Sequence, residues 1–125
     1  MERVNLSAGE WRVMEELWKA PATLMELGRA LGESAGWAKS TVSTVVRRME
    51  DKGLIRAEQE GRAKVFYPAI AREEAAVAET ESLLSRVYHG SVGLMVSTLL
   101  QNRRISEELR KELQALLEQG EEEQT

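Results

Sequence analysis

Hydroxyl-bearing and basic side chains crowd one short stretch near the middle of this 125-residue chain. Hydroxyl groups can bond phosphate oxygens and base edges, and the planar fork of an arginine can bind guanine through two hydrogen bonds. Serine and threonine are mediocre helix formers, so local helix stability does not explain why they are concentrated here. The residues with this potential are Lys39, Ser40, Thr41, Ser43, Thr44, Arg47 and Arg48. We therefore predict that they contact double-stranded DNA, with Arg47 the best candidate for a base-edge contact.

The same stretch is predicted to be a helix with one side in the core. Its aliphatic residues fall within a narrow arc at helical spacing, namely Val42, Val45, Val46 and Met49. The hydroxyls and Arg47 are left on the opposite side, and Thr41 lies on the flank. Arg48 also lies on the flank, where it either holds a phosphate or pairs with an acid inside the fold.

A basic hairpin is predicted to follow this helix. Gly53 ends the helix, Glu60-Gly61 forms the turn, and Pro68 stops the return strand. Arg62 and Lys64 flank the turn. We favour a wing that reaches the neighbouring DNA backbone or minor groove over an ordinary solvated loop.

Two shorter helices are predicted before the hydroxyl-rich one. Residues 7–10 and 23–26 are both capping boxes, in which a hydroxyl and a glutamate satisfy free amides reciprocally. Leu24 and Leu27 are expected to face inward, and Gly32 to end the second helix. Three helices and a hairpin predict a winged helix-turn-helix domain over residues 1–70.

The remaining residues predict a helical dimerisation domain over 71–119 and a disordered acidic tail over 120–125. The fold class is thus mainly α with a small β-hairpin. The segment is too thin to bury all of its apolar side chains, so a symmetric homodimer is the economical arrangement. The residues assigned to dimerisation are Leu94, Met95, Leu99, Ile105, Leu109, Leu113, Leu116 and Leu117.

Composition and charge narrow the possible functions. The net charge is −4, but residues 34–68 carry seven basic and four acidic side chains, so the acidity lies in the second half. The absence of cysteine and the single histidine argue against a metal site, and no cofactor is expected. No nucleophile stands at a recognisable spacing from a base, so we predict no catalytic residues and no enzyme. The lack of a long apolar run or a leader predicts a cytoplasmic protein without a membrane partner.

Several ordered motifs resemble the penicillinase-repressor (BlaI/MecI) family of bacterial transcriptional repressors. They include residues 6–11, 40–42, 44–49, 52–54 and 66–68, and the similarity continues through 71–74 and 88–91. The resemblance implies a winged-helix repressor that dimerises through its carboxyl-terminal helices on a dyad-symmetric operator. It also implies control of antibiotic-resistance or stress genes.

The chain departs from the family at two places. The copper-responsive branch binds metal through carboxyl-terminal cysteine pairs, which are absent here. In the penicillinase branch an inducing protease cleaves an Asn-Phe bond in the dimerisation region, and the matching position here reads Thr98-Leu99. The resemblance thus implies an inducing protease as a partner, with a different residue pair at its cleavage site.

Two alternatives to a simple repressor remain at this stage. One is a ligand-sensing winged-helix regulator of the multiple-antibiotic-resistance type. The other is a helical adaptor that binds a protein through the acidic half. Steep weakening of duplex binding by salt separates the DNA-binding proteins from the adaptor.

Overall fold

The computed structural model describes residues 5–102 and 104–124, with the backbone alone for residues 121–124. The chain forms two compact units, Met1–Ser82 and Leu83–Thr125. The first contains α1 (Ala8–Lys19), β1 (Ala22–Thr23), α2 (Leu24–Ala35), α3 (Lys39–Asp51), β2 (Ile55–Glu60) and β3 (Ala63–Pro68). Helix α4 (Arg72–Tyr88) begins in the first unit and ends in the second, which also contains α5 (Val92–Asn102) and α6 (Glu107–Gln124).

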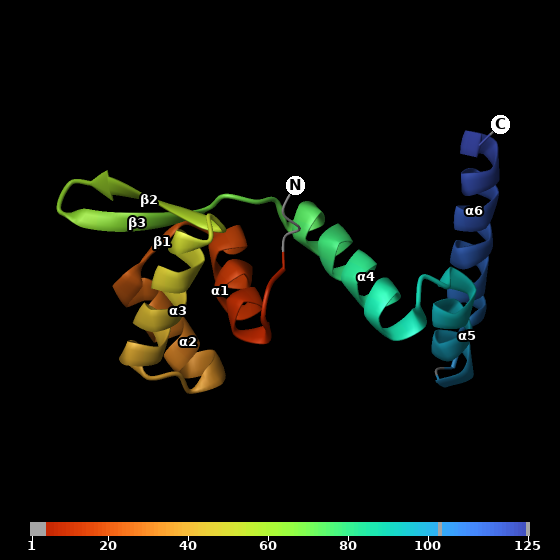
Figure 1. The fold of residues 1–125 in the computed structure, drawn as a ribbon, viewed down its shortest axis with the longest axis horizontal. Helices are drawn as coiled ribbons and strands as arrows, with labels where there is room; N and C mark the ends of the chain where they lie inside the picture. Colours follow the sequence, from red (N-terminus) through yellow and green to blue (C-terminus); the bar gives the residue numbers. More distant parts are fainter. Residues whose placement is uncertain (1–4, 103, 125) are drawn as a thin grey trace. The chain divides into compact units, whose positions relative to one another are not determined.

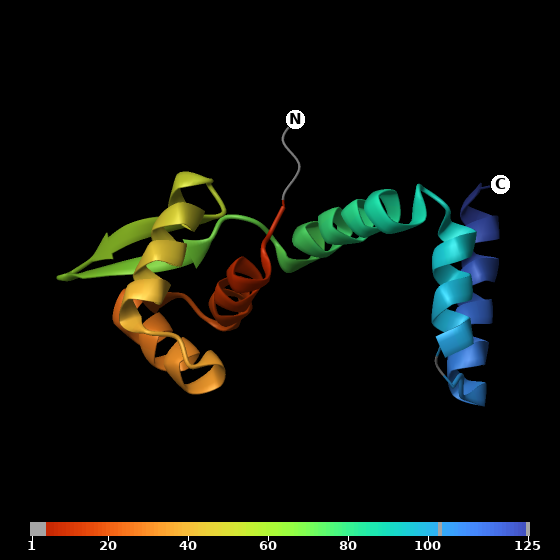
Figure 2. The same cartoon turned by 60° about the horizontal axis from the view of Figure 1, so that its bottom comes forward.

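The first unit is a three-helix cluster beside a small antiparallel sheet (Figures 1 and 2). The strand order is β1-β3-β2, and the hairpin register runs from Ile55 opposite Pro68 to Glu60 opposite Ala63. The short strand β1, which the sequence did not predict, pairs Ala22 with Phe66. This architecture confirms the predicted mainly helical winged-helix fold.

The core lies where the three helices meet the hairpin. It contains Leu6, Val13, Met14, Leu17, Leu27, Leu31, Val42, Val45, Val46, Met49, Leu54, Ile55, Phe66 and Ala75. The four aliphatic positions predicted for α3 are all buried, which fixes the side of this helix that remains exposed. Leu24 was expected inward but is exposed, because it occupies the first turn of α2 at the edge of the core.

Two predicted turns lie elsewhere. Helix α2 continues past Gly32 and ends at Gly36, whose φ of 69° is left-handed and whose amide donates to the Gly32 carbonyl. In the hairpin Glu60 still pairs with Ala63, so the two turn residues are Gly61 and Arg62 rather than Glu60 and Gly61. Gly61 has a φ of 64°, a conformation that glycine adopts without steric cost.

The start of α4 is fastened to the first unit. The Trp18 indole donates to the Ile70 carbonyl at 3.0 Å, and Arg72 forms an ion pair with Glu15 at 2.9 Å. Ala75, in the first turn of α4, is buried. These contacts explain why the compact units divide within α4 rather than near residue 70, where the sequence suggested a domain boundary.

The described residues of the second unit form helices joined by short loops. The Ser91 and Ser106 hydroxyls accept hydrogen bonds from the amides of Leu94 and Leu109, so both α5 and α6 have capped amino termini. Helix α6 continues through Gln124, whereas a disordered tail was expected over residues 120–125; Thr125 lies outside the described residues. Among the residues that the structure describes, no helix is long and apolar enough to cross a membrane.

Candidate DNA-binding surface

The exposed side of α3 carries the predicted polar surface. A shallow depression of about 410 Å³ is lined by Ser40, Ser43, Thr44, Arg47, Arg48 and Asp51. The structure thus brings together five of the seven candidate residues of this helix, and Lys39 and Thr41 are exposed nearby. The Thr44 hydroxyl donates to the Ser40 carbonyl at 2.9 Å, so its proton is already used within the helix.

Arg47 and Arg48 are adjacent in sequence but have different surroundings. Arg47 is exposed, and no ion pair or hydrogen bond of its side chain occurs among the described residues. The Arg48 Nε atom lies 3.5 Å from a carboxylate oxygen of Glu10 on α1. Of the two roles considered for Arg48, the structure therefore shows the pairing with an internal acid.

Glu10 is the one buried charged residue among those described, with an exposed fraction of 0%. Its carboxylate also accepts from the Lys52 ammonium at 2.9 Å and from the Ser7 amide at 2.8 Å. Burial by itself would raise the pKa of Glu10, but the bonds from Ser7 and Lys52 outweigh burial and lower it. A buried carboxylate thus joins α1 to the carboxyl-terminal end of α3.

Sequence reasoning found only half of this arrangement. The capping box of residues 7–10 was recognised and is present in full. Pairing of Arg48 with an internal acid was one of its two predicted roles, but the identity of that acid and the ion pair with Lys52 were not predicted, because both pairs span about 40 positions in the chain. One signal in the sequence could have indicated that Glu10 is buried: this capping glutamate lies beside the apolar face of its own helix.

The two basic side chains near the hairpin turn, Arg62 and Lys64, have different surroundings. Arg62 is exposed in the turn, and its side chain forms no hydrogen bond or ion pair within the described part of the chain. The Lys64 ammonium lies 3.5 Å from Glu50 on α3 and 5.4 Å from the centre of the Phe66 ring. Lys64 therefore connects the hairpin to α3, in addition to being exposed.

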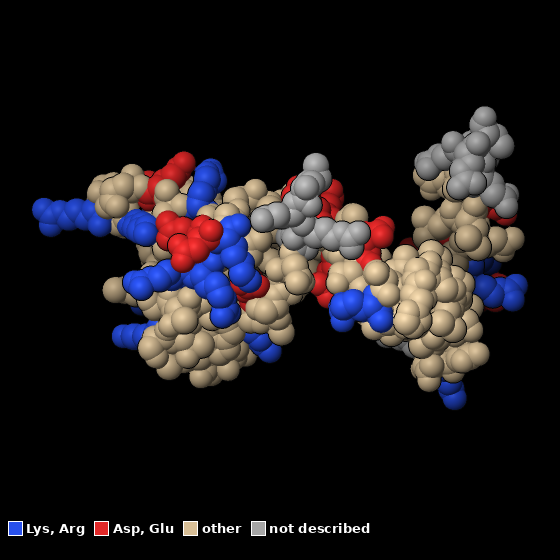
Figure 3. All heavy atoms as spheres, viewed as in Figure 1, with Lys and Arg blue, Asp and Glu red and all other residues tan. Residues whose placement is uncertain are grey.

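Contacts along the hairpin brace its two strands. Arg56 stacks over the Tyr67 ring at 4.7 Å, and the Tyr67 hydroxyl donates to Glu60. That hydrogen bond raises the pKa of Tyr67. Figure 3 shows Lys and Arg side chains gathered over the unit with α3 and the hairpin, with acidic side chains between them. This face of the unit is therefore mixed in charge rather than uniformly basic.

The second unit leaves apolar side chains uncovered. The residues assigned to dimerisation include six that are exposed in the single chain, namely Leu94, Leu99, Leu109, Leu113, Leu116 and Leu117. Met95 and Ile105 are half-buried. An apolar depression of about 620 Å³ lies between α5 and α6, with Ile105, Leu113, Leu116 and Leu117 in its lining.

The described residues contain no candidate metal site. No group of three or more His, Asp or Glu side chains could hold a metal ion there, and the sequence has no cysteine. His89 follows α4 with a left-handed φ of 51°, and the next amide, of Gly90, donates to the Leu84 carbonyl.

Known proteins resemble this chain in both sequence and fold. Residues 6–119 match the family model described as Penicillinase repressor. The chain is 30% identical over 116 residues to the penicillinase repressor of Bacillus licheniformis, covering 92% of this chain and 91% of that one. It is 26% identical to an uncharacterized 16.5 kDa protein of Latilactobacillus sakei, covering 90% of this chain and 78% of the other.

Solved structures agree with this relationship. The DNA-binding domain of the repressor BlaI in solution is 27% identical, with a TM-score of 0.53, over 58% of this chain and 90% of that one. The monomeric form of Bacillus licheniformis BlaI in complex with the blaP half-operator gives the same values. Because the family model matches nearly the whole chain, the protein belongs to the penicillinase repressor family.

Proposed function

We propose that this protein is a homodimeric transcriptional repressor that covers a dyad-symmetric operator. The observation that carries the proposal is the exposed polar side of α3, which its four buried aliphatic residues hold facing outward. A rigid helix with one free arginine and several hydroxyls suits the major groove. The relative solved with a half-operator supports duplex DNA as the ligand.

The side chains of α3 and the hairpin take different roles in this proposal. Arg47 reads a base edge, because it is the exposed arginine of α3 that has no partner among the residues described. Ser40, Ser43 and Thr41 bond phosphates or bases, while Arg62 reaches the neighbouring backbone. Arg48 and Lys64 act near phosphates only to the extent that Glu10 and Glu50 leave their charge available.

Two copies are needed to cover a full operator. Each first unit would bind one half-site, and the apolar side chains of α5 and α6 would join the copies. Exposed leucines on both helices support this, because contiguous exposed apolar surface marks an interaction site. The family relationship supports operators near antibiotic-resistance or stress genes. It also supports an inducing protease, although the expected cleavage position reads Thr98-Leu99.

The test begins with selection of duplexes from a random pool by the purified protein. Binding of the enriched duplex is then measured by fluorescence anisotropy at several salt concentrations. With about six to ten phosphate contacts per dimer, affinity should fall by about 10³–10⁵ between about 50 and 200 mM salt. Failure to enrich any sequence, or binding that salt hardly weakens, would instead favour the adaptor function.

A further inference from the structure

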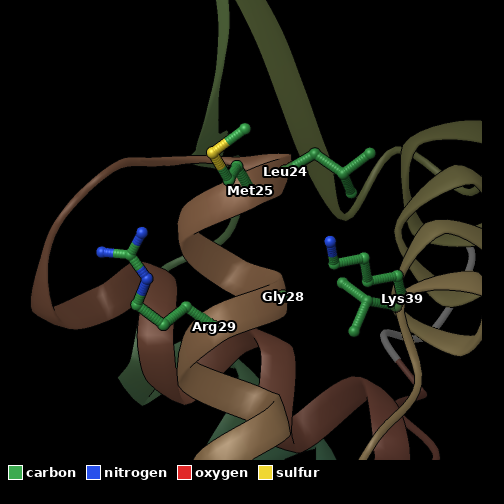
Figure 4. A pocket seen from close by; sticks show the side chains of 6 residues that line it. Leu24, Met25, Gly28, Arg29 and Lys39 are labelled. Carbon is green, nitrogen blue, oxygen red and sulfur yellow. The ribbon is translucent and has the colours of Figure 1, made fainter.

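A groove between α2 and α3 lies beside the proposed DNA-binding side of α3, and of its lining residues only Lys39 has an assigned role in DNA binding. It encloses about 670 Å³ and is lined by Leu24, Met25, Gly28, Arg29, Lys39 and Val42 (Figure 4). Met25 is 76% exposed and Leu24 39%, although both are large apolar residues at the start of a helix. Apolar side chains left open next to a binding surface indicate a further contact.

Gly28 keeps this groove open. It lies in the interior of α2, where glycine is the poorest helix former after proline. A Cβ atom at Gly28 would meet nothing within 4 Å, and its φ is not in the left-handed region. Gly9 in α1 is different, because a Cβ there would approach the Trp37 ring at 3.3 Å. Packing within the chain thus accounts for Gly9 but not for Gly28.

The charge of the groove favours an anion. Its lining contains two cations and no acid. In Figure 4 Lys39 extends into the space between the two helices, whereas Arg29 extends away from Lys39. Helix α3 begins without a side-chain cap at Ala38, so its first-turn amides are not used by such a cap and lie close to Lys39. A bound group should therefore combine negative charge with carbon-rich surface.

We propose that one sugar–phosphate strand of the operator lies in this groove. A phosphate would bind Lys39 and the first amides of α3, and a deoxyribose would pack on Leu24, Met25 and Val42. The groove continues into the surface already assigned to DNA, because Leu24 also lines a cleft with Ser43 and Arg47. This inference rests on the proposed function and adds an apolar backbone contact that positions α3.

The first experiment fills the groove in the full-length protein. Gly28→Met should weaken binding of the selected duplex at least tenfold, while the thermal midpoint stays equal or rises because methionine is the better helix former. Ser34→Met adds the same side chain at an exposed position on α2 outside the groove and should bind like the parent. Parent-like affinity of a folded Gly28→Met protein would overturn the proposal.

The second experiment locates the phosphate and does not depend on Gly28→Met folding. Duplexes with one uncharged methylphosphonate at each position are titrated with the parent and with Lys39→Met. One position should weaken the parent but cause no further loss with Lys39→Met. If every sensitive phosphate remains equally sensitive in that variant, the groove does not hold the backbone, and a small apolar acid becomes the better occupant. Failure of the proposed function would look different, because the parent would bind no duplex.

Discussion

The two units of this protein bury their apolar residues very differently. Among the described residues, every buried apolar side chain belongs to the first unit, between Leu6 and Ala75. Helix α5 buries none, and Leu117 on α6 is 73% exposed. The first unit thus completes its own core, whereas the second presents a surface that a second copy would complete.

A similar contrast occurs within α3. Among the described residues the exposed Arg47 side chain has no partner, while Arg48, and Lys52 directly after the helix, approach the buried Glu10. Under the proposed function, Arg47 is available for DNA recognition, whereas Arg48 and Lys52 support the fold. Substitutions can test both contrasts. The first predicts a change in oligomeric state, and the second predicts that DNA affinity and the free energy of unfolding respond to different residues.

The largest effect is expected from disrupting the proposed dimer. Leu113→Glu places a charge in the apolar depression between α5 and α6, so the protein should sediment as a monomer. Binding to a full operator should weaken by about 10²–10⁴-fold, because linked half-site binding is lost. Gln119→Glu adds the same charge at another exposed position of α6 and should remain dimeric. If the Leu113→Glu protein formed a dimer as stable as that of the parent, Leu113 would not belong to the dimer interface.

Arg47 and Arg48 should separate recognition from stability. Arg47→Ala should reduce discrimination at one base pair by about 1–3 kcal/mol, because a bidentate contact with guanine is lost. Arg48→Ala should instead lower the free energy of unfolding, because Glu10 loses a partner. Affinities for single-base variants of the operator and urea denaturation measure the two effects. Equal loss of affinity across all sequences would reassign Arg47 to a phosphate.

The buried Glu10 carboxylate should contribute more to the free energy of unfolding than the exposed Glu26 carboxylate. Glu10→Gln keeps the capping geometry but removes the charge, and should lower the free energy of unfolding by about 1–2 kcal/mol at neutral pH. The effect is limited because Arg48 and Lys52 are about half exposed and can be hydrated. Glu26→Gln changes the exposed capping box of α2, in which the carboxylate forms no close ion pair with a described residue and is open to water, and should have little effect.

The stabilising effect of Glu10 should also depend on pH. Its pKa is lower in the folded protein than the ordinary value of 4.5, so its contribution is fully present above that value. The contribution is lost as the pH falls through the folded-state pKa. The difference in unfolding free energy between the parent and Glu10→Gln should therefore shrink on acidification. A difference that stays constant or grows toward low pH would contradict the assignment.

The smallest effect is expected at the tip of the hairpin. Arg62→Ala should weaken all duplexes about equally and reduce the slope of log affinity against log salt by about 1 per protomer. Lys64→Ala should have less effect on this slope, because Glu50 already balances part of the Lys64 charge. Unchanged salt dependence with Arg62→Ala would mean that the hairpin turn is an ordinary solvated loop.

Much of the first unit could be predicted because its signals are local. Capping boxes at residues 7–10 and 23–26, the aliphatic arc of α3 and the turn-forming Gly61 act within one or two helical turns. Strand β1 was missed because two residues carry no periodicity, and only β3 makes them a strand. The end of α2 was misplaced because two glycines compete, and only one is left-handed.

By itself, the sequence determined which side of α3 stays exposed, because burial of Val42, Val45, Val46 and Met49 leaves one orientation. It also determined that α5 and α6 carry more apolar surface than a single chain covers. Only the tertiary structure decided which cations stay free. Arg48 and Lys52 meet Glu10, and Lys64 meets Glu50, because folding brings together residues far apart in the chain. Charge pairing depends on distance in space, which local sequence patterns do not encode.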